Sequence, residues 1–165
     1  ETQGKAVVNH DELSIVHFMA KVLSVNVSKG GIPKLPTASC NVTVDGLEGD
    51  GRNHDKHISP DRAVSLIDIE ILHQLVNEGY DVIPGAVGEN LTVENLDVQT
   101  LEPGDHLVFS GGVEIELVES RRPCFVLDPL GIDLKKIIVG RCGYLAKVIT
   151  EGIFTPGETI SVVKS

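Results

Sequence analysis

The segment Arg121-Arg122-Pro123-Cys124 places a thiol directly after two guanidinium groups and a rigid proline. Nearby positive charge favours the thiolate, which is the form of cysteine that attacks sulfur or binds a metal. A single cysteine in a β-rich chain is more often a small buried apolar residue than a nucleophile. The adjacent arginines make Cys124 the leading candidate for chemistry, and we predict that it is the most reactive thiol of the chain.

The arginines share one property, because all of them lie in or beside predicted loops. They are Arg52, Arg62, Arg121, Arg122 and Arg141. A guanidinium offers a planar fork of donors that binds phosphate or carboxylate in two places. The alternative is that these arginines form surface ion pairs with the many acidic residues. We expect Arg62 and at least one of Arg121, Arg122 and Arg141 to converge on one anion.

The other two cysteines are weaker candidates. Cys40 lies in an alternating strand pattern and is expected to be structural, while Cys142 lies in an expected tight loop and its role stays open. Three cysteines with these separations match neither a zinc ribbon nor a CxxC pair. Reduced thiols in a reducing compartment are the simplest interpretation.

Two polar, glycine-punctuated loops are further candidates, because loops on a rigid scaffold often carry sites. Residues 49–57 include two histidines and two acids, Asp50 and Asp55, and Asp61 follows nearby. No second cluster with zinc-like spacing completes a metal site, so zinc is not expected. Residues 84–91 end near Asn90, whose amide supplies both donors and an acceptor. The alternative for Asn90 is a purely structural turn.

The elements that must position these residues are mostly short strands. Apolar, β-branched segments cover 22–27, 40–44, 63–67, 107–109, 113–118 and 144–149. A Gly-Gly pair at 111–112 suits a hairpin turn. One helix is predicted from about Asp68 to Glu78, ended by Gly79, and a shorter one near 133–138. This pattern predicts a mainly β fold, a closed or nearly closed β-barrel with one or two short helices.

Length and charge restrict the classes of function. A chain of 165 residues fits one domain, and we place it at 19–165, with 1–18 as an upstream extension or added sequence because that segment lacks periodicity. A net charge of -10 argues against non-specific nucleic-acid binding. No apolar run is long enough for a membrane span and no signal peptide is visible, so a soluble, cytoplasmic protein is expected.

From Met19 to the C-terminus, the sequence resembles the MOSC domain family, in the form of small stand-alone bacterial proteins. The resemblance rests on five motifs in order: Gly46-Leu-Glu-Gly-Asp50, Ser59-Pro-Asp-Arg-Ala-Val64, Gly88-Glu-Asn-Leu-Thr92, Arg121-Arg-Pro-Cys124 and Gly140-Arg-Cys-Gly-Tyr144. It implies a barrel like the β domain of pyruvate kinase. It also implies that Cys124 carries sulfur or ligates molybdenum.

The resemblance adds residues near the site and marks two departures. His57, Asp61 and Arg62 are implied to lie near the site, although this chain has Ile58-Ser59 where the family commonly has Gly-Gly. Cys142 stands where relatives often carry glycine, so a second thiol near Cys124 and an inert replacement are both open.

The leading hypothesis is a protein that binds the molybdenum cofactor (molybdopterin) and reduces N-hydroxylated small molecules, with Cys124 as the molybdenum thiolate. The cofactor-binding candidates are Arg62, Arg121, Arg122, Arg141, His57, Asp61 and Asn90. Electrons would come from a partner reductase, because no flavin or nicotinamide fingerprint is visible.

Two alternatives stay open. The first is a sulfur carrier that accepts a persulfide on Cys124 from a pyridoxal-phosphate-dependent cysteine desulfurase and delivers it to a metal–sulfur acceptor. The second is a non-catalytic barrel that binds some other anion. Metal and pterin analysis of the purified protein separates these hypotheses.

Overall fold

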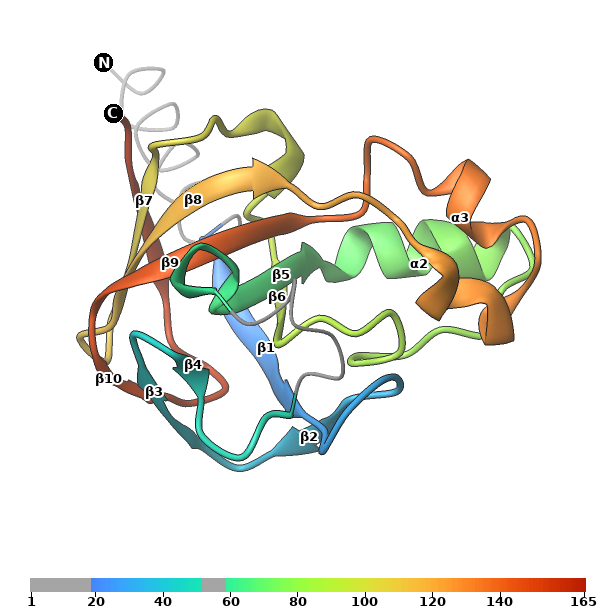
Figure 1. The fold of residues 1–165 in the computed structure, drawn as a ribbon. Coiled ribbons are helices and arrows are strands. Elements are labelled where there is room, and N and C mark those ends of the chain that lie inside the picture. The colour runs from blue at the N-terminus through green and yellow to red at the C-terminus, as the bar shows by residue number, and fades with distance from the viewer. Residues whose placement is uncertain (1–18, 52–58) are drawn as a thin grey trace, which may run out of the picture.

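Short strands dominate the computed structural model, which describes residues 19–51 and 59–165 (Figure 1). The strands are β1 (Lys21–Val27), β2 (Leu35–Thr37), β3 (Cys40–Thr43), β4 (Gly46–Leu47), β5 (Val64–Asp68), β6 (Leu91–Glu94), β7 (His106–Phe109), β8 (Glu114–Ser120), β9 (Tyr144–Thr150), β10 (Gly152–Phe154) and β11 (Ile160–Val163). Eight form one sheet in the order β11-β7-β8-β9-β5-β6-β1-β2, and β10-β3-β4 form a second.

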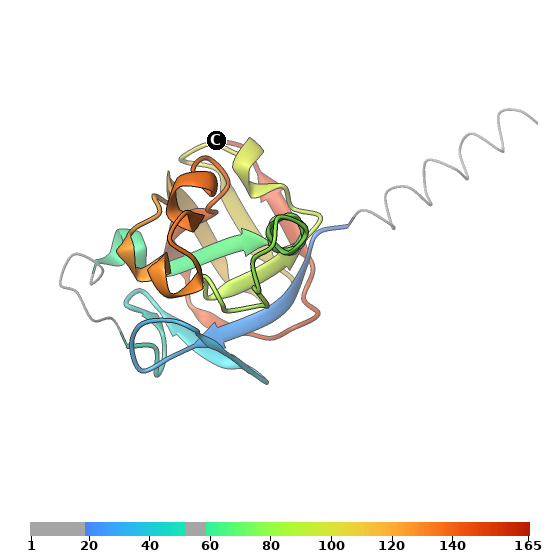
Figure 2. The same ribbon diagram turned by 90° about the vertical axis from the view of Figure 1, so that its right-hand side faces the viewer.

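The large sheet is antiparallel except at one pair. β5 and β6 run parallel because α2 (Ile69–Asn77) and a loop return the chain between them. The predicted hairpin is present between β7 and β8, where Gly112 has a φ of +107°. The strands twist around a shared interior, as the end-on view shows (Figure 2).

Hydrogen bonding does not close this sheet. Within 19–51 and 59–165, its edge strands are β2 and β11. In these ranges, the β1 and β11 sides meet only in an isolated bridge from Lys21 to Thr159 and in backbone hydrogen bonds between residues 20–22 and 157–160. Two segments share one edge of β1. β2 pairs with Val25–Val27, and the turn before β11 hydrogen-bonds to Val22 near the start of β1. The mainly β fold with two short α-helices is confirmed. The closed or nearly closed barrel is corrected to a twisted sheet that is not closed.

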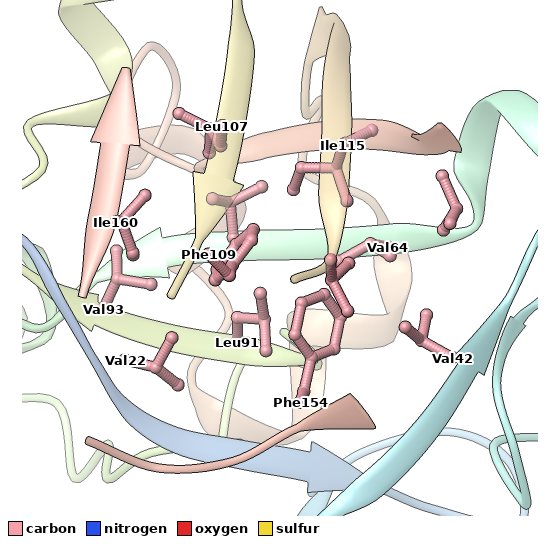
Figure 3. Packing of buried hydrophobic residues seen from close by; sticks show 14 of the residues in the cluster. Val22, Val42, Val64, Leu91, Val93, Leu107, Phe109, Ile115, Phe154 and Ile160 are labelled. Carbon is pink, nitrogen blue, oxygen red and sulfur yellow. The ribbon is translucent and has the colours of Figure 1, made fainter. Parts of the chain in front are cut away.

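The interior of the curved sheet is an apolar cluster. Side chains from both sheets point into one space, where Phe109 and Phe154 meet edge to face with ring centroids 4.9 Å apart (Figure 3). Ile115 and Leu107 are fully buried beside them. Alternation along each strand builds this core, since every second residue faces inward.

A second apolar layer covers the outer face of the sheet. It is built by α2, by the 3-10 helix η4 (Phe125–Leu130) and by α3 (Leu134–Ile137), whose buried members include Leu72, Leu127 and Leu134. The two α-helices match the predicted ones to within a residue or two. The remaining 3-10 turns are η2 (Pro60–Arg62) and η3 (Val98–Thr100). In the part of the chain that the structure describes, no helix has the length and apolarity of a membrane span.

Candidate functional site

A pocket of about 400 Å³ lies where the ends of β5, β8 and β9 meet the loops around them. Its lining comes from residues 31–34, 50–51, 62–65, 88–90 and 119–126, together with Leu145. This volume falls within the usual range for small-molecule sites, about 300–1,000 Å³. The segments are far apart in sequence, so the fold assembles the pocket.

Three strands supply the floor of this pocket through one row of paired residues. Ser65 on β5 pairs with Leu145 on β9, and Leu145 pairs with Glu119 on β8. Their neighbours Leu66 and Ala146 belong to the interior core. Because successive side chains of a strand face opposite sides, the row lies on the outer face of the sheet.

A β-bulge explains why Glu119 belongs to this row. By simple alternation it would follow Ile115 and Leu117 into the core, but the register of β8 against β9 shifts between Leu117 and Glu119. An extra residue in one strand turns the following side chain to the other face. The bulge therefore moves a carboxylate from the core side to the pocket.

The predicted reactive segment forms one wall. Arg121, Arg122, Pro123 and Cys124 all line the pocket, directly after β8 and before η4. The Cys124 side chain is partly exposed, whereas Cys40 and Cys142 are buried. Cys124 is thus the thiol that a ligand in the pocket can reach.

Arg121 is held by the neighbouring loop. Its Nη2 donates to the Val87 carbonyl oxygen at 2.7 Å. A Cβ on Gly88 would lie 3.2 Å from that nitrogen, and Gly88 has a φ of +90°, so a side chain here is disfavoured by both contact and conformation. The second terminal nitrogen, Nη1, is buried and has no hydrogen-bond partner among the described residues. Arg121 therefore has an unused donor beside the pocket.

The acid Glu89 lies near Arg121 but forms no direct hydrogen bond to it among the described residues. Its Oε2 accepts hydrogen bonds from the Gly85 amide and the Thr92 hydroxyl, while Oε1 is buried without a partner among the described residues. Burial raises the pKa of Glu89, partly opposed by those bonds and by Arg121. A raised pKa favours the neutral acid. No ion pair joins the two within the described ranges.

The basic side chains of the pocket differ in whether an acidic side chain forms an ion pair with them. Lys34 pairs with Asp50 at 2.5 Å, and Arg62 pairs with Glu119 at 2.9 Å. Neither Arg121 nor Arg122 forms an ion pair with a described residue. The described lining thus holds four basic and two acidic side chains in a protein of net charge -10. Such a local excess favours an anion.

Asn90 organises the framework behind the pocket. Its Nδ2 donates to Asp50 Oδ2 at 2.9 Å and to the Asn26 carbonyl, and its Oδ1 accepts from the amide and hydroxyl of Ser65. Asn90 is 4% exposed, so these bonds are shielded from water. The structure gives this lining residue a positioning role, and direct contact with a ligand stays a prediction.

The other residues predicted from the sequence to bind the ligand do not all line the pocket. Arg141 is not a lining residue, because its guanidinium forms a two-point ion pair with Glu78 at 2.6 and 2.7 Å. Asp61 is exposed and also outside the lining. His57 and Arg52 lie outside the described residues. Arg62, Arg121 and Arg122 do converge on one pocket, and their action on a ligand stays a prediction.

The second thiol near Cys124 has a buried, apolar environment. Cys142 is fully buried in the outer apolar cluster. Burial raises its pKa, and the Arg121 guanidinium opposes that rise only partly. This environment favours an uncharged thiol, as expected of the inert replacement that the sequence analysis leaves open.

Two charged side chains of the described pocket lining, Lys34 and Glu119, were not predicted from the sequence. Lys34 lies outside every motif considered, and nothing in its neighbourhood signals a site. Glu119 carries a detectable signal, because it continues the apolar series Val113, Ile115 and Leu117 with an acid. A charged residue at the next inward position of a strand predicts either the end of the strand or a bulge.

Comparison with known proteins identifies the family. Residues 53–161, about two thirds of the chain, match the MOSC domain. The chain belongs to the MOSC domain family. This assignment confirms the resemblance and covers the segments from η2 to β11, including Cys124 and the pocket arginines.

Solved structures of bacterial proteins share the MOSC fold seen here. The YuaD protein from Bacillus subtilis superposes with a TM-score of 0.76 at 18% identity, covering 89% of this chain and 97% of that one. YiiM from Geobacillus stearothermophilus gives a TM-score of 0.71 at 27% identity, covering 88% and 75%. A fungal protein named "Reductase", from Gibberella moniliformis, is 34% identical over 90 residues, which span 52% of this chain and 16% of that protein.

Proposed function

We propose that this MOSC protein binds an anionic molybdenum cofactor in the pocket and serves as an oxidoreductase, with Cys124 as the protein ligand of the metal. The observation that carries the proposal is the combination of an accessible thiol with two uncompensated guanidinium groups in one pocket. A thiolate is a soft ligand and suits such a metal. The cofactor would supply the redox-active metal.

The chemistry of the pocket fits a phosphate-bearing group. Arg121 Nη1 is a buried donor without a described partner, and leaving such a donor unpaired costs about 1–3 kcal/mol. An anionic oxygen placed against it would remove that cost and form a charge-assisted bond. Arg122, exposed at the same wall, would add a second cation. Arg62 would contribute its remaining nitrogens.

The reduction of N-hydroxylated small molecules is the activity that we assign to this site. The fungal relative named "Reductase" supports reductive chemistry in general terms. Electrons would arrive from a partner reductase, because the sequence carries no flavin or nicotinamide fingerprint. Substrate would enter beside Cys124 from the open side of the pocket.

The test is metal and pterin content after expression in cells that make molybdenum cofactor. Wild-type protein is expected to carry molybdenum and pterin in equal amounts. Cys124→Ser is expected to lose the metal, and Arg121→Ala to lose both, because one removes the soft ligand and the other the buried cation. The matched controls are Cys40→Ser and Arg141→Ala, which alter residues outside the pocket and should retain both.

Two results would contradict the proposal. Wild-type protein without molybdenum, but with one added sulfur atom on Cys124 by mass spectrometry, would favour the sulfur-carrier hypothesis, with a pyridoxal-phosphate-dependent desulfurase as donor. Wild-type protein with neither group, yet tight binding of another anion that depends on Arg121, would favour a non-catalytic binding module.

A further inference from the structure

Two buried side-chain atoms beside the pocket have no hydrogen-bond partner among the described residues, and they belong to groups of opposite charge type. They are Oε1 of Glu89 and Nη1 of Arg121. Glu89 is 0% exposed, and the Arg121 guanidinium acts on its carboxyl group electrostatically. Buried polar atoms are usually hydrogen-bonded, so each exception needs a physical reason. Two exceptions in one electrostatically coupled pair suggest that the pair responds to a ligand.

One loop holds both groups in place. Glu89 Oε2 accepts hydrogen bonds from the Gly85 amide at 2.9 Å and from the Thr92 hydroxyl at 2.7 Å. Two residues after Gly85, the Val87 carbonyl oxygen accepts from Arg121 Nη2 at 2.7 Å. Each side chain is therefore anchored by one polar atom, while its other terminal atom keeps its bonding capacity.

Opposing effects set the charge of Glu89. Burial raises its pKa, whereas its hydrogen bonds and the positive charge of Arg121 lower it. The Cys142 thiol, which precedes β9, also interacts with Glu89 and has a pKa raised by burial. The polar neighbours from β6 and β1 are uncharged, since they are the Thr92 hydroxyl and the Asn26 amide, which donates to the Glu89 backbone carbonyl. Arg121 thus supplies positive charge that favours the ionised carboxylate.

We infer that Glu89 is a proton-linked counter-charge of Arg121, so that the pocket takes up a proton from solvent when an anion binds to Arg121. An anionic oxygen against Nη1 offsets the charge that favours ionised Glu89, and the buried carboxylate then binds a proton. The inference deepens the proposed function by naming a control on its anion site. It rests on that function only for the binding of an anion.

The direction of the pH dependence follows from the two states of the pocket. A bound anion raises the pKa of Glu89 above its value in the free pocket, because negative charge near a carboxylate disfavours ionisation. Between these two values the bound form holds a proton that the free form lacks, so anion affinity falls as pH rises. Below both values Glu89 is neutral in either state, and above both it is ionised in either state.

The experiment measures sulfate binding by calorimetry in buffers of different ionisation enthalpy, which gives the number of protons taken up for each anion bound. Sulfate stays a dianion near neutral pH, whereas a phosphate group titrates there with a pKa of about 6. Wild-type protein is expected to take up a proton and to bind sulfate up to about tenfold more tightly for each unit fall in pH. Glu89→Gln should bind sulfate without this proton uptake and without this pH dependence.

The variants are chosen to separate charge from structure. The amide oxygen of Glu89→Gln can still accept the Gly85 and Thr92 hydrogen bonds, so the loop keeps its anchor. Glu48→Gln is the control, because it removes an exposed carboxylate outside the pocket lining and should keep wild-type proton uptake. Difference infrared spectroscopy gives a direct second measurement. The carbonyl band of a neutral carboxylic acid should grow when sulfate is added to wild-type protein, and should not grow in Glu89→Gln.

The inference is overturned if wild-type protein binds sulfate without taking up a proton, if Glu89→Gln takes up as many protons as wild type, or if wild-type protein does not bind sulfate. Should Glu89→Gln fail to fold, the infrared result on wild-type protein decides, since an unchanged carboxylic acid band also overturns the inference. None of these measurements requires metal. Failure of the cofactor assignment is seen separately, in the molybdenum and pterin content of protein from cofactor-producing cells.

Discussion

The two faces of the large sheet are built for different purposes. The interior face is lined by apolar side chains such as Phe109, which packs against Phe154 of the smaller sheet. The outer face carries the pocket, and the two buried polar atoms without partners in the described ranges, Glu89 Oε1 and Arg121 Nη1, both lie beside it. Strand alternation produces both faces from the same segments. Both faces therefore carry apolar packing, and among the described residues the unused bonding capacity lies on the outer side.

The strongest test of this division is truncation of an interior aromatic. Phe154→Ala is expected to lower the free energy of unfolding by about 3–5 kcal/mol, because the ring is fully buried and its removal leaves a cavity. Urea denaturation measures the loss. Ile132→Ala is the control, since Ile132 is 81% exposed and its truncation should change stability by no more than about 0.5 kcal/mol. Similar losses in both variants would contradict the assignment of the interior as the stabilising side.

The next prediction compares the thiol of the pocket with the two buried thiols, Cys40 of the interior core and Cys142 of the outer layer. Cys124 is expected to be alkylated at least about tenfold faster than Cys40 or Cys142 at neutral pH, because it is accessible and adjoins two guanidinium groups. Burial raises the pKa of both other thiols. Time-resolved alkylation read by mass spectrometry gives the three rates. Faster labelling of Cys142 would contradict the prediction. It would show that the outer apolar layer opens readily and that Cys124 is not the most reactive thiol.

Much of the fold could be predicted because local rules dominate it. Alternating β-branched segments gave the longer strands, and the apolar stripe between Asp68 and Gly79 gave α2. Barrel closure could not be predicted, because it depends on which segment occupies the free edge of β1. That edge is shared between β2 and the turn that precedes β11, and a three-residue strand such as β2 leaves little trace in a sequence.

The sequence predicted the pocket residues correctly where they are neighbours in the chain. Arg121, Arg122 and Cys124 are adjacent in sequence and remain adjacent in the pocket. Arg141 resembles them in type and loop position, yet its guanidinium is taken by Glu78 on α2. Ion-pair choice depends on tertiary neighbours, which residue type does not reveal. Glu119 was missed for a related reason, because a one-residue bulge reverses the face that alternation predicts.

The smallest effect is expected at an electrostatic cluster on the outward side of β7 and β8, away from the pocket lining. His106 Nδ1 lies 2.6 Å from Glu114 and Nε2 lies 3.2 Å from Glu116, which also contacts Lys147 at 3.4 Å. The Glu114 hydrogen bond, with help from Glu116, raises the pKa of His106. A raised folded-state pKa stabilises the protein fully below the unfolded imidazole pKa of about 6.5, and this stabilisation disappears as pH rises through the folded value.

His106→Gln should therefore be less stable than wild type at acidic pH, by a small amount because the groups are partly exposed, and equal to it at alkaline pH. Urea titrations across that range measure the difference, with His73→Gln at an exposed position of α2 as the control. A difference that grows toward alkaline pH would contradict the assigned ion pairs, and a change in Cys124 alkylation would contradict the separation of this cluster from the pocket.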